Sequence, residues 1–293
     1  MSLPSNVYES IHRAWMGDTL EGLKDFIRIP AKSRAFNPNW ESDGILKRTL
    51  EDSAEWGRRL LPCAEFEIIE KPGIPPALFI RIPTAGGHKG KPAFFYGHLD
   101  KQPETEGWSE GLGPWTPVVR DGRIWGRGAD DDKGQSFMHI KAFEAMCATG
   151  QLPCNVKFML EGEEEIGSQS LYKFCREQKR LLKSDVILVS DTSMISMDTP
   201  SITCGLRGLT YMQVEVTGPD KDLHSGLFGG AVANPANVLA RLVASLVDDE
   251  GRVTIPGFYD DVRELSAAER RALNKAPFRL ADYKRSLHIG DVA

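Results

Sequence analysis

Acidic residues and one histidine follow apolar segments at four places in the sequence. The four groups are His98 with Asp100, residues 130–132, residues 163–165, and Asp191. Neighbouring carboxylates repel one another and are poorly solvated beside apolar side chains, so they need a cation, a proton or open water. Zinc and hard divalent cations accept imidazole nitrogen and carboxylate oxygen, and one carboxylate can bridge two ions about 3.5–4 Å apart. The four groups therefore predict a metal site.

Each group taken alone has a simpler explanation. His98 could cap a strand, residues 130–132 could form a solvated turn, and Asp191 could cap a helix. Residues 163–165 could lie at an exposed helix N-terminus, where the helix dipole favours acids. A phosphate site in "GRGADDDKG" is disfavoured because no Gly-Lys-Ser/Thr follows and three anions would repel phosphate. The metal site is favoured because all four groups follow strands, and one crevice can gather them.

The segments that would position these groups alternate between strand and helix. Residues 20–27 have helical spacing that ends at Pro30, and residues 133–146 have helical spacing again. The apolar strands are predicted in "PAFFYGHLD", "NVKFML" and "DVILVS", with a hairpin in "VVRDGRIW" that turns at Asp121-Gly122. This order predicts an α/β fold whose sheet is largely parallel and covered by helices on both faces. Ligands bind such sheets at the carboxyl ends of the strands.

The pattern changes after Cys204. Residues 205–218 alternate between apolar and polar types, which predicts a strand with one face in water, in an antiparallel sheet. An amphipathic helix should follow, with Asn234 as its N-cap and Pro235 in its first turn. We predict a catalytic, metal-binding domain over residues 1–205 and a second, α+β domain over residues 206–293. Residues 251–293 give no functional prediction.

Composition limits the classes of partner. The chain has 293 residues, of which 41% are hydrophobic and 26% charged, and a net charge of −5. Its Lys and Arg residues are scattered, so nucleic acid and anionic membranes are not expected as partners. No apolar run reaches the ~20 residues that cross a bilayer. The five cysteines show no metal-finger spacing and are expected to be reduced thiols in the cytoplasm.

Five segments in this order resemble those of the dinuclear zinc peptidase family that includes carnosinase, other cytosolic dipeptidases, aminoacylase and glutamate carboxypeptidase. The carnosinase-like dipeptidases are the most similar group. The segments are "FFYGHLDKQP", "WGRGADDDKGQ", "LEGEEEIGSQSL", "VSDTS" and "DLHSGLFGG". The resemblance implies a zinc exopeptidase-like catalytic domain, an incomplete lid and dimerisation domain, a small peptide substrate and a homodimer formed through the lid.

The same resemblance implies a metal role for four residues. Asp131 would bridge two zinc ions, in place of which manganese or cobalt could bind. His98 and Asp191 would complete one zinc site, and Glu165 would serve the other. Zinc with three protein ligands is a stable arrangement, whereas two carboxylates leave the second site half open.

Three further residues match catalytic positions of the family. Glu164 would be the general base that takes a proton from water, and Asp100 would orient the His98 imidazole. His224, in the second domain, would stabilise the oxyanion of the substrate carbonyl, often from the partner subunit. Its alternative explanation is a histidine in a Gly-rich turn.

The sequence departs from the family pattern in its last part. Such enzymes take a final histidine ligand for the Glu165 metal from a segment well downstream, but only His288 follows His224, and "RSLHIGDVA" does not resemble that segment. Either the chain is part of a longer protein, which we favour, or its second site is defective. We expect this chain by itself to hold at most one metal tightly and to have little peptidase activity.

The predicted function is metal-dependent hydrolysis of dipeptides or short peptides from the free amino end. A relative acting on N-acyl amino acids or from the carboxyl end is the first alternative. It is less favoured because such relatives tend to carry Glu at the position of Asp191. The second alternative, a non-catalytic metal-binding relative or inactive fragment, is opposed by the presence of Glu164.

Overall fold

The structure is a computed structural model that describes residues 5–84, 91–196 and 199–292. The chain divides into two compact units, Met1–Thr192 and Ser193–Ala293. The first unit contains the four acidic groups, and the second contains His224. The domain assignment made from sequence, with its boundary after residue 205, stays a prediction.

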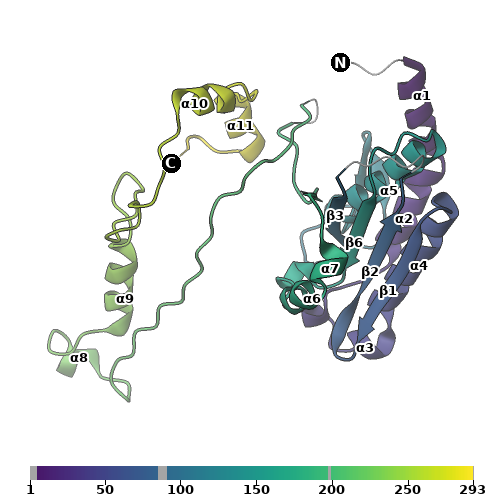
Figure 1. Cartoon of the computed structure of the whole chain (residues 1–293). Helices are drawn as coiled ribbons and strands as arrows, with labels where there is room; N and C mark the ends of the chain where they lie inside the picture. The colour runs from purple at the N-terminus through teal and green to yellow at the C-terminus, as the bar shows by residue number, and fades with distance from the viewer. Residues whose placement is uncertain (1–4, 85–90, 197–198, 293) are drawn as a thin grey trace. The chain divides into compact units, whose positions relative to one another are not determined.

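A five-stranded sheet forms the centre of the first unit (Figure 1). Its order is β1 (Glu65–Lys71), β2 (Ile74–Ile82), β6 (Val156–Glu161), β3 (Ala93–His98) and β7 (Val186–Val189). β2 pairs antiparallel with both β1 and β6, whereas β3 pairs parallel with both β6 and β7. β2 is thus the one strand of this described sheet that runs against the others. The predicted α/β fold with a largely parallel sheet is confirmed.

The parallel register brings the predicted site residues to one edge of the sheet. His98 is paired with Glu161 at the end of β6, and Tyr96 is paired with Val189 at the end of β7. Asp191 lies two residues beyond Val189, just as His98 lies two residues beyond Tyr96. His98 and the acidic residues that follow β6 and β7 therefore lie at the same edge of the sheet.

Helices cover both faces of the sheet (Figure 1). On one face, Phe158 and Leu160 pack with side chains of α4 (Ile45–Leu60) and α5 (Lys133–Ala148). On the other face, Met159 packs with Phe174 of α6 (Leu171–Glu177) and with leucines of α7 (Lys179–Leu182). Each fully buried Phe, Leu or Met contributes roughly 1.5–3 kcal/mol relative to exposure. Successive side chains of β6 thus pack on opposite faces of the sheet, which holds in place the strand that leads to the acidic turn at residues 163–165.

Other elements of this unit follow local sequence signals. α2 (Leu20–Arg28) ends before Pro30, as expected, and packs on α5 through Phe26 and Phe137, whose rings lie 4.9 Å apart. The hairpin of β4 (Val118–Arg120) and β5 (Arg123–Trp125) turns at Asp121-Gly122, with positive φ angles of 54° and 71°. These angles are those that a type I′ turn needs. The remaining α-helices described in this unit are α1 (Ser5–Ala14) and α3 (Trp40–Asp43).

The strand β7 differs from the expectation of burial on both faces. Its four side chains are exposed, from 38% at Leu188 to 66% at Ile187. β7 is an edge strand, and in the described residues only β3 pairs with it. An apolar run predicts burial only if neighbouring elements cover it, and here the side chains on both faces of β7 are exposed.

The second unit lacks the predicted strand, so that prediction is wrong for this structure. Residues 205–218 form an extended run without strand pairing (Figure 1), and Leu209 and Tyr211 are 91% and 89% exposed. A strand needs a partner for its backbone N–H and C=O groups, and the described residues of this unit supply none. The alternation of apolar and polar residues identifies an amphipathic segment, but it does not show whether another strand is available to pair with it.

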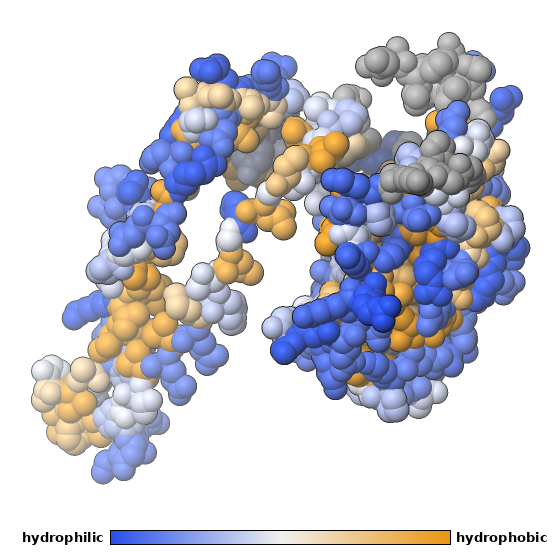
Figure 2. All heavy atoms as spheres, in the orientation of Figure 1, coloured by the Kyte–Doolittle hydropathy of each residue, from blue (hydrophilic) through white to orange (hydrophobic). Residues whose placement is uncertain are grey.

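The described part of the second unit also contains four helices, joined by turns and loops. They are α8 (Ser225–Phe228), α9 (Pro235–Ala244), α10 (Ala267–Leu273) and α11 (Leu280–Leu287). In α9 the predicted N-cap is correct, because Asn234 accepts the N–H of Ala236. α10 begins with a capping box between Ser266 and Glu269, a signal that the sequence analysis missed. None of the four helices has a buried residue, and apolar side chains lie open on their surface (Figure 2). In the parts of the chain that the structure describes, no helix is long and apolar enough to span a bilayer.

Candidate metal centre

The imidazole of His98 is the centre of the acidic cluster. Its Nε2 lies 2.9 Å from Oδ1 of Asp131, 3.7 Å from Oδ2 of Asp191 and 3.8 Å from Oε2 of Glu164. His98 is fully buried, whereas the three acids are partly exposed on the open side. Three of the four residues predicted as metal ligands are thus brought together, with Glu164 beside them.

Asp100 lies behind His98 and connects it to the acidic turn. Nδ1 of His98 is 3.3 Å from Oδ1 of Asp100 and 3.2 Å from its backbone oxygen. The same carboxylate accepts the backbone N–H groups of Glu164 and Glu165 at 3.1 and 3.2 Å, and the hydroxyl of Ser33 at 2.6 Å. Sequence reasoning placed Asp100 behind His98 but did not identify its contacts with the turn or with Ser33.

The loop before α5 directs Asp131 and Asp132 to different places. The Asp131–Asp132 peptide bond is cis. Asp131 reaches Nε2 of His98, whereas Oδ2 of the buried Asp132 accepts the backbone N–H of His98 at 3.1 Å. Position 97 must be glycine, because a Cβ there would lie 2.5 Å from Oδ2 of Asp132 and 2.8 Å from the Ser136 hydroxyl.

Glu165 lies outside the group of three because another residue holds it. Gln102 donates its backbone N–H to Oε1 of Glu165 at 3.2 Å and its side-chain amide to Oε2 at 2.7 Å. The amide also reaches the backbone oxygen of Glu165 at 3.2 Å. Sequence analysis missed Gln102, although it lies inside the quoted segment "FFYGHLDKQP". Its part in the site depends on long-range contacts, which local spacing does not reveal.

Glu161 and Glu163 support the turn from the other face of the sheet. The hydroxyls of Tyr96 and Ser168 donate to Glu161, the latter at 2.6 Å. Glu163 accepts the N–H of Ser170 at 2.8 Å, and Nη2 of Arg34 lies 2.5 Å from its Oε1. These contacts occupy the two buried carboxylates, whereas Glu164 and Glu165 are only partly buried.

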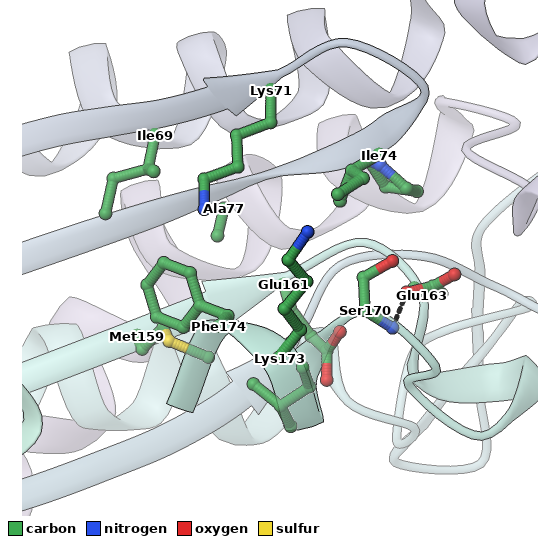
Figure 3. A pocket seen from close by; sticks show the side chains of 12 residues that line it. Ile69, Lys71, Ile74, Ala77, Met159, Glu161, Glu163, Ser170, Lys173 and Phe174 are labelled. Carbon is green, nitrogen blue, oxygen red and sulfur yellow. Dashed lines mark hydrogen bonds between the residues drawn. The ribbon is translucent and has the colours of Figure 1, made fainter. Parts of the chain in front are cut away.

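A pocket adjoins this support but is too small for a peptide. Figure 3 shows it between β1, β2, β6 and α6, with Glu161 and Glu163 at one side. Its other lining residues include Ile69, Ile74, Met159 and Phe174. Its volume is about 40 Å³, which holds only a few water molecules. The pocket therefore belongs to the packing behind the turn and not to a substrate site.

The remaining predicted residue, His224, is the N-cap of α8 in the second unit. Its Nδ1 accepts the N–H of Gly226 at 3.0 Å. This contact is that of a turn histidine, and its role toward a substrate stays a prediction. His288 ends α11 with a left-handed φ of 56°.

The electrostatics of the cluster favour a bound cation. Burial alone would lower the pKa of His98, but hydrogen bonds that its ring donates to Asp100 and Asp131 outweigh burial and raise the pKa to about 11. Burial raises the pKa values of Asp191 and Glu164, and neighbouring carboxylates add to the effect. The imidazole and the carboxylates around it therefore form a site that a cation, either a proton or a metal ion, would stabilise.

The donor atoms fit a metal ion of the zinc type. One imidazole nitrogen and two carboxylate oxygens, from His98, Asp131 and Asp191, lie within 4.8 Å of one another. Two ligands at about 2.0–2.2 Å from one zinc ion are at most ~4.4 Å apart, so small side-chain rotations suffice. Among the described residues, this is the one group of three or more His, Cys, Asp or Glu with that proximity. Asp100 supplies the acceptor that a ligating imidazole needs on its other nitrogen.

Fold and site together define an α/β protein with a candidate histidine–carboxylate metal site at the carboxyl ends of parallel strands. Residues 94–282 match the model of the Peptidase family M20/M25/M40. The chain belongs to this family.

Two curated relatives illustrate the similarity. The Beta-Ala-His dipeptidase of Rattus norvegicus is 38% identical over 221 residues, which cover 73% of this chain and 44% of the relative. The Cys-Gly metallodipeptidase dug1 of Schizosaccharomyces pombe is 38% identical over 203 residues, covering 67% of this chain and 42% of the relative. The chain thus spans less than half the length of these relatives.

Solved structures show the same fold. Human carnosine dipeptidase 1 aligns with a TM-score of 0.71 at 28% identity, covering 100% of this chain and 62% of that one. An M20 family metallo-carboxypeptidase, Sso-CP2 from Sulfolobus solfataricus, aligns with a TM-score of 0.74 at 28% identity, covering 94% and 60%. The fold is therefore shared with one protein named as a dipeptidase and another named as a carboxypeptidase.

Proposed function

We propose that the protein is a zinc-dependent dipeptidase that hydrolyses dipeptides or short peptides from the free amino end. The observation that carries the proposal is the convergence of His98, Asp131 and Asp191 on one point, with Glu164 3.8 Å from the same imidazole nitrogen. The similarity to two metallodipeptidases supports this substrate class.

The residues of the cluster would have separate roles in metal binding and proton transfer. His98, Asp131 and Asp191 would hold one zinc ion, and Asp131 with Glu165 would hold a second, which manganese or cobalt could replace. When bound, zinc supplies Lewis acidity, which makes a water molecule easier to deprotonate. Glu164 then takes the proton from the attacking water. The partly exposed position of Glu164 and the burial that raises its pKa suit a general base.

Glu164 and Glu165 are adjacent but have different surroundings. Asp100 accepts both backbone N–H groups and fixes the turn, so the two side chains diverge from a rigid base. Gln102 binds the Glu165 carboxylate, whereas Glu164 stays beside His98. The proximity of Glu164 to the proposed zinc site supports its proton-transfer role, whereas the ligand role of Glu165 rests on the family resemblance.

A second candidate function is hydrolysis of N-acyl amino acids or removal of a carboxyl-terminal residue. The alignment with the metallo-carboxypeptidase Sso-CP2 favours it. We prefer the dipeptidase because position 191 carries Asp, the residue associated with recognition of a free amino terminus in the family resemblance. A non-catalytic metal-binding relative is the third possibility.

Partners and compartment are part of the same proposal. The substrate is a small peptide, and the second unit would form a homodimer in which His224 reaches the substrate of the partner subunit. All five cysteines are unpaired, as suits a reducing compartment such as the cytoplasm.

Zinc titration with product analysis tests the proposal. The metal-stripped chain is titrated by calorimetry, and dipeptides, their N-acetylated forms and N-acetyl amino acids are assayed at each zinc equivalent. Because little turnover is expected of this chain by itself, the same substrates are also assayed with a longer form of the protein. There the dipeptidase assignment predicts hydrolysis of free dipeptides only, lost in His98→Ala, whereas preference for the N-acetylated substrates would select the second candidate. Tight zinc binding with no turnover in the longer form would select the third.

A further inference from the structure

The side chain of His139 connects the two segments that supply Asp131 and Asp191. His139 lies in α5, the helix that begins at Lys133, directly after the Asp131 loop. Its Nε2 lies 2.7 Å from the hydroxyl oxygen of Ser190. Ser190 immediately precedes Asp191, so this hydrogen bond links α5 to the segment that follows β7.

The end of β7 needs such a connection. The ladder with β3 ends at the pair Tyr96 and Val189, and β7 has no second partner among the described strands. The exposed side chains of β7 add little packing at this point. Asp191 lies two residues past the ladder, where the sheet itself no longer fixes the backbone.

The imidazole of His139 is itself held firmly. Its ring centroid is 4.9 Å from that of Phe95, 6.2 Å from that of Phe143 and 5.8 Å from that of Phe158. Burial among these rings lowers the pKa of His139 to about 4, so the side chain is neutral at pH 7. A neutral, rigid imidazole can bind the Ser190 hydroxyl without placing another charge beside the acidic cluster.

We propose that His139 is a positioning residue that holds Asp191 at the metal centre through Ser190. It does not contact the metal or the substrate, and it acts by fixing where the chain goes after β7. Because α5 starts beside Asp131, the same contact sets the spacing between two ligands that come from different elements. The inference rests on the proposed ligand role of Asp191.

A double-mutant cycle tests the connection. His139→Phe keeps the aromatic packing but removes the hydrogen bond, and Ser190→Ala removes it from the other side. Each variant should weaken binding of the first zinc equivalent by about tenfold to a hundredfold. The double variant should be no weaker than the worse single variant, because both changes break one contact. His139→Gln, which retains a polar group near the hydroxyl, should recover part of the affinity.

Two controls separate positioning from general damage. Met138→Ala changes an exposed neighbour on α5, and Ser42→Ala removes a serine hydrogen bond to Asn39 on α3, so both should bind zinc as the unchanged chain does. Wild-type affinity in His139→Phe and Ser190→Ala, or losses that simply add in the double variant, would overturn the proposal.

Hydrogen exchange of the metal-free chain gives a readout that does not depend on zinc. Amides of residues 188–192 should exchange faster in His139→Phe and Ser190→Ala than in Met138→Ala. Unchanged exchange rates would refute the positioning role even in a chain that binds no metal. Absence of zinc binding in the unchanged chain, with faster exchange in the variants, would instead refute the proposed metal function alone.

Discussion

Oδ1 of Asp100 accepts the backbone N–H of Glu164 at 3.1 Å, across a separation of 64 residues in the chain. The same oxygen lies 3.3 Å from Nδ1 of His98. One buried carboxylate therefore sets the orientation of the imidazole and the position of the acidic turn at once. Removing its charge should disturb both sides of the candidate metal centre.

Asp100→Asn should weaken zinc binding by about 10- to 100-fold, the usual effect of losing the partner of a ligating histidine. The amide has one acceptor oxygen in place of two, so it cannot serve Ser33, His98 and the turn together. Calorimetric zinc titration measures the change. Asp52→Asn, on the exposed side of α4, is the matched control, and equal affinity in the two variants would argue against the role of Asp100.

Glu164→Gln tests whether Glu164 acts as a general base or as a metal ligand. In a form of the protein that hydrolyses dipeptides, the change should lower turnover by about 10² to 10⁴, because a neutral amide cannot accept the proton. Zinc content by atomic absorption should stay at the unchanged level. Glu55→Gln on the exposed surface should alter neither quantity. Loss of zinc in Glu164→Gln would mean that Glu164 is a ligand.

Lys101→Met tests how the loop after β3 is anchored. Lys101 is fully buried, and its Nζ donates to the backbone oxygens of Ile27 at 2.8 Å and Ile29 at 3.0 Å. Burial lowers its pKa to about 5, and the nearby cations Lys133 and Arg127 add to the effect. The backbone oxygen of Phe26, at 3.4 Å, is a third acceptor for this group.

Methionine would leave the Ile27 carbonyl without the donor that Lys101 supplies, whereas the Ile29 carbonyl would keep the backbone N–H of Ala31 at 2.9 Å. An unsatisfied buried carbonyl costs about 1–3 kcal/mol, so the free energy of unfolding should fall by about 1–3 kcal/mol. Denaturant unfolding measures it. Lys173→Met, at a side chain that is 72% exposed, should stay within about 0.5 kcal/mol of the unchanged chain. Similar effects of the two changes would contradict the anchoring role.

His139 should make stability depend on pH. Its pKa is about 4 in the folded chain and about 6.5 when unfolded, and burial is the cause. Between these values the unfolded chain binds more protons, so the contribution of His139 to the free energy of unfolding rises with pH. A shift of this size corresponds to roughly 3 kcal/mol, fully present above pH 6.5 and lost as pH falls toward 4.

The difference in the free energy of unfolding between the unchanged chain and His139→Phe separates the effect of His139 protonation from the titration of the carboxylates. Urea unfolding of both proteins at several pH values between 4 and 7 measures it. The unchanged chain should gain stability relative to the variant as pH increases. A difference that does not vary with pH would show that His139 is not buried in its neutral form.

Local sequence determined the elements and the residues at their ends. Pro30 ended α2, Asp121-Gly122 predicted the hairpin turn, and Asn234-Pro235 predicted the start of α9, because each signal acts within a few residues. The apolar strands predicted an α/β sheet, and the types of residue after them predicted metal chemistry. None of these inferences needed a contact distant in sequence.

Tertiary structure decided what those residues contact. Strand register placed His98 level with Glu161 and brought Asp191 to the same edge, and long-range hydrogen bonds assigned Gln102 to Glu165 and His139 to Ser190. The alternating residues 205–218 show the converse, since their pattern is typical of a strand but no partner strand exists for them in the described chain. A pattern reports which side chains prefer water, whereas pairing and burial depend on neighbours that only the folded chain supplies.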